Sequence, residues 1–465
     1  MKSVIAIVGR PNVGKSTLFN FLTKSRNALV ADRPGITRDR QYGFGSYQGR
    51  KFILIDTGGL GRNDKDSTNI ANLISDQSLR AIEEANVLIW LVDGRDSVTS
   101  EDEHLAKVLR PMCEHIFLTA NKTEGLNVDI VLSDLYRQGF DNLYAISAKR
   151  GDGVRHLMDE VIQHLPAESE DKIQIEHGLR ITVLGRPNVG KSTLTNRILG
   201  EERVLTFNQP GTTRDSIAIP FKRNGQPYTL IDTAGIRRRS KITDTIEKFS
   251  IVKSLQAIDS TQIVVLVLNA QEAITEQDAT LLGLIADSGK ALIIAVNKWD
   301  GLEVSHKARI KAQLDRKLGF LDYACIHFIS ALHGSGVGKL FVSVNKISKS
   351  LSIEPVASKV TTILQQAVEA HPPPMVRGRR IKLRYAHLGG HDPIRIIVHG
   401  NQTERVPKSF KRYLANQMRK QLKLVGAPVL IEFKQGENPY KNRKNILTSR
   451  QIEKRRRLMR HVKEK

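Results

Sequence analysis

Two eight-residue segments of this chain have the residue types and the spacing that bind phosphate groups. Residues 9–16 read Gly-Arg-Pro-Asn-Val-Gly-Lys-Ser, and residues 185–192 repeat them letter for letter. The pattern G-x-x-x-x-G-K-[ST] between a strand and a helix is that of the P-loop, in which backbone N–H groups at a helix N-terminus cradle phosphates. We therefore expect two nucleotide sites, which contain Gly9, Arg10, Pro11, Asn12, Val13, Gly14, Lys15 and Ser16 in the first copy and Gly185, Arg186, Pro187, Asn188, Val189, Gly190, Lys191 and Ser192 in the second.

Each loop is expected to hold a magnesium ion beside the phosphates. The loop lysine would reach the β- and γ-phosphates, and the serine hydroxyl would bind Mg²⁺. An aspartate that ends an apolar run in each copy would point its carboxylate at the metal. Matched Pro-Gly-x-Thr-Arg-Asp stretches supply a threonine that would close on the metal and the γ-phosphate, as the switch of a GTPase does. The predicted metal ligands are Ser16, Thr37 and Asp56 in the first copy and Ser192, Thr213 and Asp232 in the second.

The Asn-Lys-Trp-Asp segment at residues 297–300 indicates which base is bound. Guanine presents an N1–H and a 2-amino group that one carboxylate accepts together, whereas adenine has an acceptor at N1 and no such group at C2. Asp300 therefore favours GTP over ATP. Lys298 would lie along the base, Asn297 would bond the base and tie loops together, and Ala331 would donate its N–H to guanine O6. The expected base site contains Asn297, Lys298, Trp299, Asp300, Ser330 and Ala331.

The corresponding segment of the first copy reads Asn-Lys-Thr-Glu, so a glutamate stands where the second copy has an aspartate. The extra methylene keeps the charge but changes its reach. We expect guanine to be bound here too, more weakly. The alternative is that Glu124 only begins a polar loop and that the first site is degenerate. The residues expected here are Asn121, Lys122, Thr123, Glu124, Ser147 and Ala148.

The residues that would assist hydrolysis differ from those of many G proteins. A glutamine often orients the attacking water, but Leu60 and Ile236 stand at that position and neither side chain hydrogen-bonds water. Asn12 and Asn188 would help to hold a monovalent cation against the phosphates, and they join Thr37 and Thr213 as the catalytic candidates. The arginines at 237–239 are an alternative, beside the simpler interpretation of a solvated segment. The expected GTP sites also include Thr57, Gly58, Gly59, Leu60, Thr233, Ala234, Gly235 and Ile236.

The two copies repeat at an offset of 176 residues, which predicts two tandem domains of one fold. Short apolar runs alternate with helical patterns, so we expect α/β domains with mostly parallel, doubly wound sheets. Runs at 41–47 and 216–222 precede turn signals and would pair antiparallel with the strand that follows. The other strands are expected at 4–8, 52–56, 87–92, 116–120 and 143–146, and then at 181–184, 228–232, 263–268, 292–296 and 326–329.

Composition divides the chain further. Residues 351–465 hold 26 Lys and Arg against 8 Asp and Glu, within a total net charge of +24, so a polyanion partner is expected at this end. The third domain is expected to be a small α+β unit, with helices at about 361–369 and 408–424 and strands at about 381–385, 394–398 and 429–433. The expected boundaries are 1–165 and 179–350 for the two repeated domains, 166–178 for a linker, 351–440 for the third domain and 441–465 for a basic tail.

The sequence offers no disulfide framework, because its only two cysteines are Cys113 and Cys325. It has no run of 18 or more apolar residues, and its first eight residues lead directly into the glycine loop. We therefore expect no membrane span, no signal peptide and a cytoplasmic protein.

These motifs together resemble the Der (EngA) family of bacterial GTPases with two G domains. The resemblance rests on the paired P-loops, on Asp-Thr-Gly-Gly at 56–59, on Asp-Thr-Ala-Gly-Ile-Arg-Arg-Arg at 232–239 and on Asn-Pro-Tyr at 438–440, and it covers essentially the whole chain. It implies hydrolysis of GTP to GDP, a KH-like C-terminal domain, and a role in assembling the large (50S) ribosomal subunit with its rRNA. It also implies that potassium, bound by the loop asparagine, substitutes for a catalytic arginine.

The third domain departs from the usual KH pattern, because residues 351–435 contain no G-x-x-G with a basic interior between two helices. Gly-Gly-His-Asp at 389–392 lies between expected strands instead. RNA contact is therefore expected from charge, including the tail, which holds 11 Lys and Arg and would be disordered or fold only on binding. The candidate contacts are Arg377, Arg379, Arg380, Lys408, Lys411 and Arg412.

Two other functions stay open at this point. Leu60 and Ile236 allow an RNA-binding scaffold whose G domains bind nucleotide without useful turnover. An ATPase of the same loop class is disfavoured by Asp300. Whichever function holds, we expect the protein to be a monomer.

Overall fold

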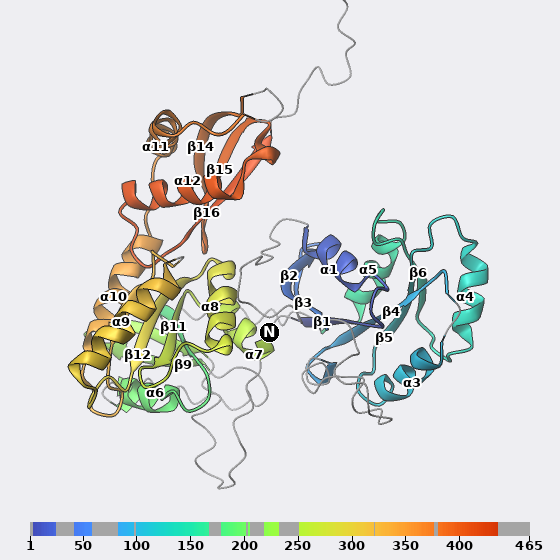
Figure 1. Ribbon diagram of the computed structural model, residues 1–465, viewed down its shortest axis with the longest axis horizontal. Coiled ribbons are helices and arrows are strands. Elements are labelled where there is room, and N and C mark those ends of the chain that lie inside the picture. The colour runs from blue at the N-terminus through green and yellow to red at the C-terminus, as the bar shows by residue number, and fades with distance from the viewer. Residues whose placement is uncertain are drawn as a thin grey trace, which may run out of the picture. The chain divides into compact units, whose positions relative to one another are not determined.

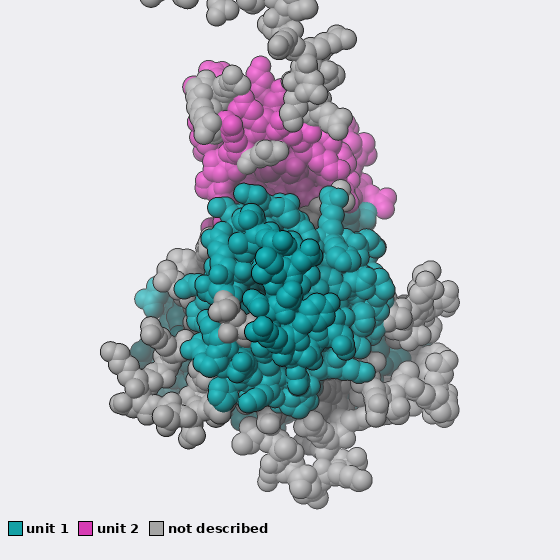
Figure 2. Space-filling view, turned by 90° about the vertical axis from the view of Figure 1, so that its right-hand side faces the viewer, with its two compact units in different colours: residues 1–353, 390–394, 422–430 teal, residues 354–389, 395–421, 431–465 magenta. Residues whose placement is uncertain are grey.

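The computed structural model describes residues 3–24, 41–57, 82–96, 99–166, 178–200, 203–204, 218–231, 251–319, 321–375 and 380–435. It forms two compact units, which Figure 2 colours separately. Unit 1 spans residues 1–353 with the short segments 390–394 and 422–430, and unit 2 contains residues 354–389, 395–421 and 431–465.

The first repeated domain is built on a six-stranded sheet with the order β2-β3-β1-β4-β5-β6 (Figure 1). Its strands pair parallel except β2, which runs antiparallel to β3 as the turn signal predicts. The elements are β1 (Ser3–Val8), α1 (Lys15–Lys24), β2 (Gln41–Tyr47), β3 (Arg50–Asp56), β4 (Val87–Asp93), α3 (Ser100–Leu109), β5 (Ile116–Asn121), α4 (Val128–Tyr136), β6 (Leu143–Ala145) and α5 (Val154–Gln163).

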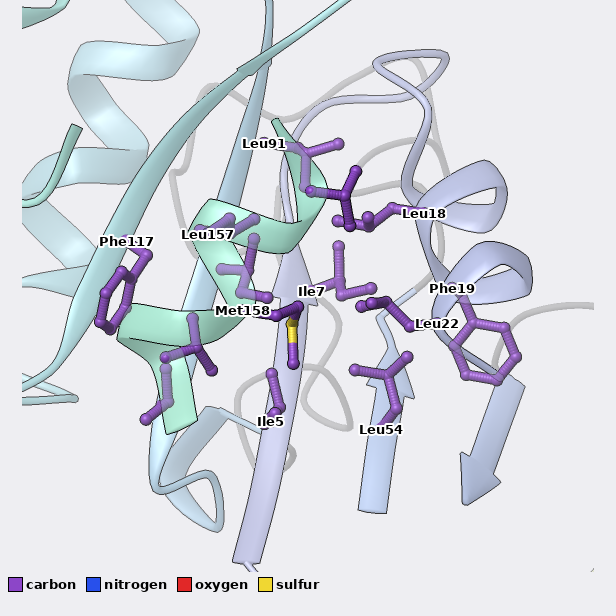
Figure 3. Packing of buried hydrophobic residues seen from close by; sticks show 14 of the residues in the cluster. Ile5, Ile7, Leu18, Phe19, Leu22, Leu54, Leu91, Phe117, Leu157 and Met158 are labelled. Carbon is purple, nitrogen blue, oxygen red and sulfur yellow. The ribbon is translucent and has the colours of Figure 1, made fainter. Parts of the chain in front are cut away.

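Strand β1 is buried on both faces, which explains why it is a continuous apolar run. Side chains of a strand alternate between faces, so Val4 and Ala6 join the core on one side with residues of α3, while Ile5 and Ile7 join the core on the other. Figure 3 shows this second core, in which Leu18 from α1 and Met158 from α5 pack beside Ile5 and Ile7. The loop that follows Val8 thus begins at a strand whose position is fixed by packing on both faces.

The second repeated domain has the same sheet with one extra short edge strand, in the order β13-β12-β11-β7-β10-β9-β8. Strand β9 pairs antiparallel with both β8 and β10. All other neighbouring strands of this sheet pair parallel, including β10 with β7. This confirms the predicted fold of both repeats. The elements are β7 (Leu179–Leu184), α6 (Lys191–Gly200), β8 (Arg203–Val204), β9 (Ala218–Arg223), β10 (Gln226–Ile231), α7 (Ile251–Ser260), β11 (Ile263–Asn269), α8 (Glu276–Ser288), β12 (Ala291–Asn297), α9 (Val304–Leu318), β13 (Cys325–Phe328) and α10 (Val337–Leu351).

The third region has the predicted α-β-β-α-β order and a three-stranded sheet, β14-β15-β16. Its two helices pack against each other and bury Val360, Leu364, Leu414 and Met418. Thr361 joins helix to sheet, because its hydroxyl donates to the Ala386 carbonyl at 2.9 Å and accepts from the Ala386 N–H at 3.1 Å. The elements are α11 (Ala357–Ala370), β14 (Lys382–His391), β15 (Ile394–Asn401), the 3₁₀ turn η3 (Thr403–Arg405), α12 (Lys408–Gln421) and β16 (Val429–Gln435).

The Gly-Gly-His-Asp segment lies mostly inside a strand, not between strands as expected. Gly389, Gly390 and His391 are the last residues of β14, and only Asp392 belongs to the turn before β15. A side chain at Gly389 would meet Ile397 of β15 at 2.6 Å, so strand packing explains this glycine. Within the described part of the chain, no helix has the length and apolar character to span a bilayer.

Candidate nucleotide-binding sites

The first phosphate loop leaves β1 at Val8 and enters α1 at Lys15, which is the strand–loop–helix context that the motif requires. Two glycines of this loop cannot carry a side chain. A Cβ on Gly9 would stand 2.2 Å from the Leu91 carbonyl oxygen, and one on Gly14 would stand 2.2 Å from Nδ2 of Asn121, both at positive φ. The loop is thus packed tightly against β4 and β5.

The second loop repeats this geometry between β7 and α6. A Cβ on Gly185 would meet the Val267 carbonyl oxygen at 2.5 Å, and one on Gly190 would meet Nδ2 of Asn297 at 2.2 Å. The loop asparagine is left-handed in both copies, with φ 66° at Asn12 and 63° at Asn188. Asparagine is one of the few residues that tolerate this conformation, which explains its type at this bend.

Lys15 points back over its own loop. Its ammonium donates to the carbonyl oxygens of Gly9 at 2.8 Å and Arg10 at 2.7 Å, and the residue is 5% exposed. Burial lowers the pKa of Lys15 from 10.5 to about 8, against the opposing effect of the Asp56 carboxylate. Lys191 makes the corresponding bond to the Arg186 carbonyl at 2.7 Å. A cation held at this place is in position for the phosphates of a nucleotide.

A hydroxyl and a carboxylate meet beside the first loop. Oγ of Ser16 donates to Oδ2 of Asp56 at 2.7 Å, at the carboxyl end of β3. The next residue, Thr57, is tied to β1 because its hydroxyl donates to the Ile7 carbonyl at 2.9 Å. Hydroxyl and carboxylate oxygens are the ligand types that Mg²⁺ prefers, so these residues fit the metal that the sequence predicts.

One asparagine in each domain joins three loops. Nδ2 of Asn297 donates to the Val189 carbonyl in the phosphate loop at 2.9 Å, and Oδ1 accepts the N–H of Ala331 at 2.8 Å. In the first domain, Asn121 makes the same pair of bonds with Val13 at 2.8 Å and Ala148 at 2.9 Å. The predicted role of tying loops together is therefore visible in both copies. The Ala331 N–H that we expect at guanine O6 is engaged by Asn297 here.

Asp300 is fixed at the rim of the second base site. The Ser330 hydroxyl is the main cause that lowers the pKa of Asp300, with further help from its own backbone N–H, His333 and Lys307. His333 Nε2 lies 3.2 Å from Oδ2 of Asp300. Beside it, Trp299 packs on Phe328 with ring centroids 4.1 Å apart. The Asp300 carboxylate is therefore kept ionised, which is the state that can accept hydrogen bonds from both the N1–H and the 2-amino group of guanine.

Glu124 occupies the matching position in the first domain. Its own backbone N–H and then the Ser147 hydroxyl lower the pKa of Glu124, and Arg95 and Arg150 add to this effect. Arg95 donates to Oε1 at 2.8 Å. Ser147 and Ser330 therefore each lower the pKa of the carboxylate that follows the Asn-Lys pair of their domain. The neighbouring Lys122 Nζ lies 2.5 Å from Oδ2 of Asp93.

An ion pair that no motif indicated anchors each phosphate loop. Nε of Arg10 donates to Oδ1 of Asp102 at 2.9 Å, and Nε of Arg186 donates to Oδ1 of Asp278 at 2.9 Å. Both aspartates are nearly fully buried and also close the capping box that begins α3 or α8. The signal was present, because Thr-x-x-Asp recurs at residues 99–102 and 275–278 with the same offset as the loops.

Several predicted site residues lie outside the described residues, so their predicted roles stay predictions. They are Thr37, Gly58, Gly59, Leu60, Thr213, Asp232, Thr233, Ala234, Gly235 and Ile236, together with the alternative arginines at 237–239, the RNA candidates Arg377 and Arg379, and the tail.

The geometry defines the class of the protein, which has two P-loop nucleotide-binding domains in tandem, followed by a small α+β domain. Two family models match this arrangement. One, described as a 50S ribosome-binding GTPase, matches residues 4–122 and 180–298, and the other, described as the KH-domain-like C-terminal part of EngA bacterial GTPase enzymes, matches residues 356–434.

Curated relatives match over the whole chain. GTPase Der of Thioalkalivibrio sulfidiphilus is 54% identical over 100% of both chains. GTPase Der of Legionella pneumophila (strain Corby) is 52% identical with the same coverage, and that of Pseudomonas putida (strain W619) is 50% identical over 100% of this chain and 98% of its own. The chain therefore belongs to the GTPase Der family, a family of GTP hydrolases with two G domains and a KH-like C-terminal domain.

Among solved structures, Aquifex aeolicus Era bound to GDP and AlF₄⁻ matches 56% of this chain and 93% of its own. It is 18% identical with a TM-score of 0.28.

Proposed function

We propose that this protein hydrolyses GTP to GDP and phosphate as a nucleotide-dependent switch in the assembly of the large (50S) ribosomal subunit. Its basic C-terminal part would contact the rRNA of that particle. The observation that carries the proposal is the duplicated phosphate loop, whose lysine is buried in the first copy, where Ser16 also donates a hydrogen bond to the Asp56 carboxylate. The descriptions of the two matching family models support the choice of a ribosomal particle.

Mg²⁺ is the proposed cofactor of both sites. The bond between Ser16 and Asp56 supports this assignment in the first domain, and Thr37 would be the third protein ligand. In the second domain the proposed ligands are Ser192, Thr213 and Asp232. These residues would hold the ion beside the phosphates, where it would supply positive charge.

K⁺ is the proposed second cation, held with the help of Asn12 and Asn188. Both side chains are exposed at the outer bend of their loops, and both backbones are already left-handed. The chain has Leu60 and Ile236 where a water-orienting glutamine would stand, so hydrolysis needs other assistance, and a cation against the phosphates would offset the charge that develops there.

We assign guanine recognition to Asp300 in the second domain and to Glu124 in the first. The support is that a serine hydroxyl and neighbouring cations hold each carboxylate ionised at the matching place. Glu124 is longer and is bonded to Arg95, so its site would bind guanine less tightly than the site of Asp300.

We also propose the domain limits 1–165, 179–350 and 351–440, with 166–178 as linker and 441–465 as a basic tail. The matched ranges 4–122, 180–298 and 356–434 fall inside these limits. The protein would act as a monomer in the cytoplasm.

Two measurements test the proposal. Purified 50S subunits are centrifuged with the protein and GTP, GDP or no nucleotide, and we expect cosedimentation to differ between these states. Equal cosedimentation in all three would refute the switch. Phosphate release is then measured in potassium and in sodium, with faster turnover expected in potassium. Negligible release in both salts would leave the constitutive RNA-binding scaffold as the better account.

A further inference from the structure

Three rings from two strands of the C-terminal sheet form a column. The rings of Tyr385 in β14 and His399 in β15 stack with centroids 4.4 Å apart and planes 9° apart. His399 stacks in turn with His387 of β14, at 5.3 Å and 27°. Alternate residues of a strand share a face, so Tyr385 and His387 lie on the side opposite to the fully buried Ala386. The ring column thus stands on the sheet face that points away from the core.

The column is held in place and has an accessible end. Nε2 of His387 lies 3.2 Å from Nε2 of His399, so one imidazole donates a hydrogen bond to the other and fixes both rings. Burial, and then the neighbouring His387 and Lys434, lower the pKa of His399, which favours its neutral form. Tyr385 is the outermost ring. It stacks on His399 with one face, and its 48% exposure leaves ring surface open to solvent.

The domain that carries the ring column is strongly basic. Lys434 of β16 is exposed and lies near enough to His399 to lower its pKa, whereas Lys382 and Arg384, although exposed on the strand of Tyr385, share the face of Ala386. The carboxylate of Glu432 is bound by Arg395, whose Nε lies 3.1 Å from Oε1. Residues 380–435 hold 12 Lys and Arg against 3 Asp and Glu. A polyanion that also offers flat rings is complementary to such a surface.

We propose that the ring column is a stacking site for an unpaired base of single-stranded RNA. The base would stack on the outer face of Tyr385, and the cation of Lys434 would attract a neighbouring phosphate. Bases of a duplex are already stacked on one another, so they cannot use this site. The inference rests on the RNA contact of the proposed function and gives that contact a location, which charge alone does not.

The test compares two labelled strands of about 12 nucleotides, oligouridine and a base-free strand with the same sugar-phosphate backbone, on the full-length protein. Stacking of one base changes the dissociation constant by about 5-fold to 150-fold. Wild type should therefore prefer oligouridine by at least about fivefold. Tyr385→Leu should lose this preference while it keeps its affinity for the base-free strand, which shows that fold and charge are intact. Tyr385→Phe keeps a ring and should behave as wild type.

Tyr136→Leu is the matched control, because Tyr136 is an exposed tyrosine of the first domain. It should bind both strands as wild type does. Equal binding of the two strands by wild type, or a preference that survives in Tyr385→Leu, would refute the stacking site while the RNA contact itself stands. Loss of 50S binding by Tyr385→Leu with unchanged oligouridine binding would also refute it and indicate a protein partner. A wild-type protein that binds neither strand nor 50S subunits would refute the RNA contact as well.

Discussion

Truncating Asn297 should separate the loops of the second nucleotide site. Asn297 is 3% exposed and makes two bonds, to the Val189 carbonyl at 2.9 Å and from the Ala331 N–H at 2.8 Å. Asn297→Ala leaves both backbone groups buried without their partner. Each unsatisfied group costs about 1 to 3 kcal/mol, so the free energy of unfolding of this domain should fall by about 2 to 5 kcal/mol. For a domain of this size the melting temperature should drop by about 5 to 15 °C.

The assay is thermal unfolding with and without GDP, together with titration of labelled GDP. Asn345→Ala is the matched control, because Asn345 accepts a single bond from the Tyr228 hydroxyl at 2.6 Å and lies in α10. It should lose about 1 kcal/mol and keep its GDP affinity. Asn121→Ala should produce the same loss in the first domain. An Asn297→Ala protein with unchanged stability and GDP affinity would refute the idea that this side chain assembles the site.

Further predictions concern the residues around the two loops. Gly190→Ala places a Cβ about 2.2 Å from Nδ2 of Asn297 at positive φ, so GDP binding to the second site should be lost while the first site still binds, as labelled-GDP titration would show. Asp278→Ala leaves the Arg186 guanidinium without its buried carboxylate and should cost about 3 to 5 kcal/mol in urea unfolding, whereas Glu272→Ala, at an exposed partner of the same arginine, should cost less than about 1 kcal/mol. The pKa of Lys15 in the folded protein, about 8, lies below its ordinary value of 10.5. Between these two values the unfolded chain binds more protons than the folded protein, so the free energy of unfolding rises with pH there. Lys15→Met should thus be more stable than wild type near neutral pH, by up to about 3 kcal/mol, and lose this advantage above about pH 10. In a Lys191→Ala background, the first site should bind GDP more tightly than inosine diphosphate, which lacks the 2-amino group, and Glu124→Ala should abolish this difference.

Much of the fold was predictable because both repeats are governed by local patterns. Strand β2 begins and ends where its apolar run predicts, Gln41–Tyr47, since a turn signal follows it directly. Strand β14 was harder, because its second half contains Gly389 and Gly390, which usually weaken a strand. Here the glycines make room for Ile397 of the neighbouring strand, and only the pairing of strands reveals that reason.

The site was predictable where a short motif contains all the residues of one function. The spacing of residues within their motifs was enough to predict the phosphate loops and the asparagines that connect them to other loops. The ion pair of Arg10 with Asp102 was missed because its members are 92 residues apart and neither matches a motif for nucleotide binding. Likewise, Glu124 departs from the pattern in sequence, but Arg95 donates to it and Ser147 lowers the pKa of Glu124 as Ser330 lowers that of Asp300, and these partners become neighbours only when β4, β5 and β6 are assembled.

The most direct test of the central claim is the number of guanine nucleotides bound per chain and their turnover in Lys15→Ala and Lys191→Ala, each with and without 50S subunits. Two working GTPase domains predict two bound nucleotides in wild type, one in each variant, and GTP hydrolysis that falls in both variants. A wild-type chain that binds only one nucleotide, or that binds ATP more tightly than GTP, would contradict the account.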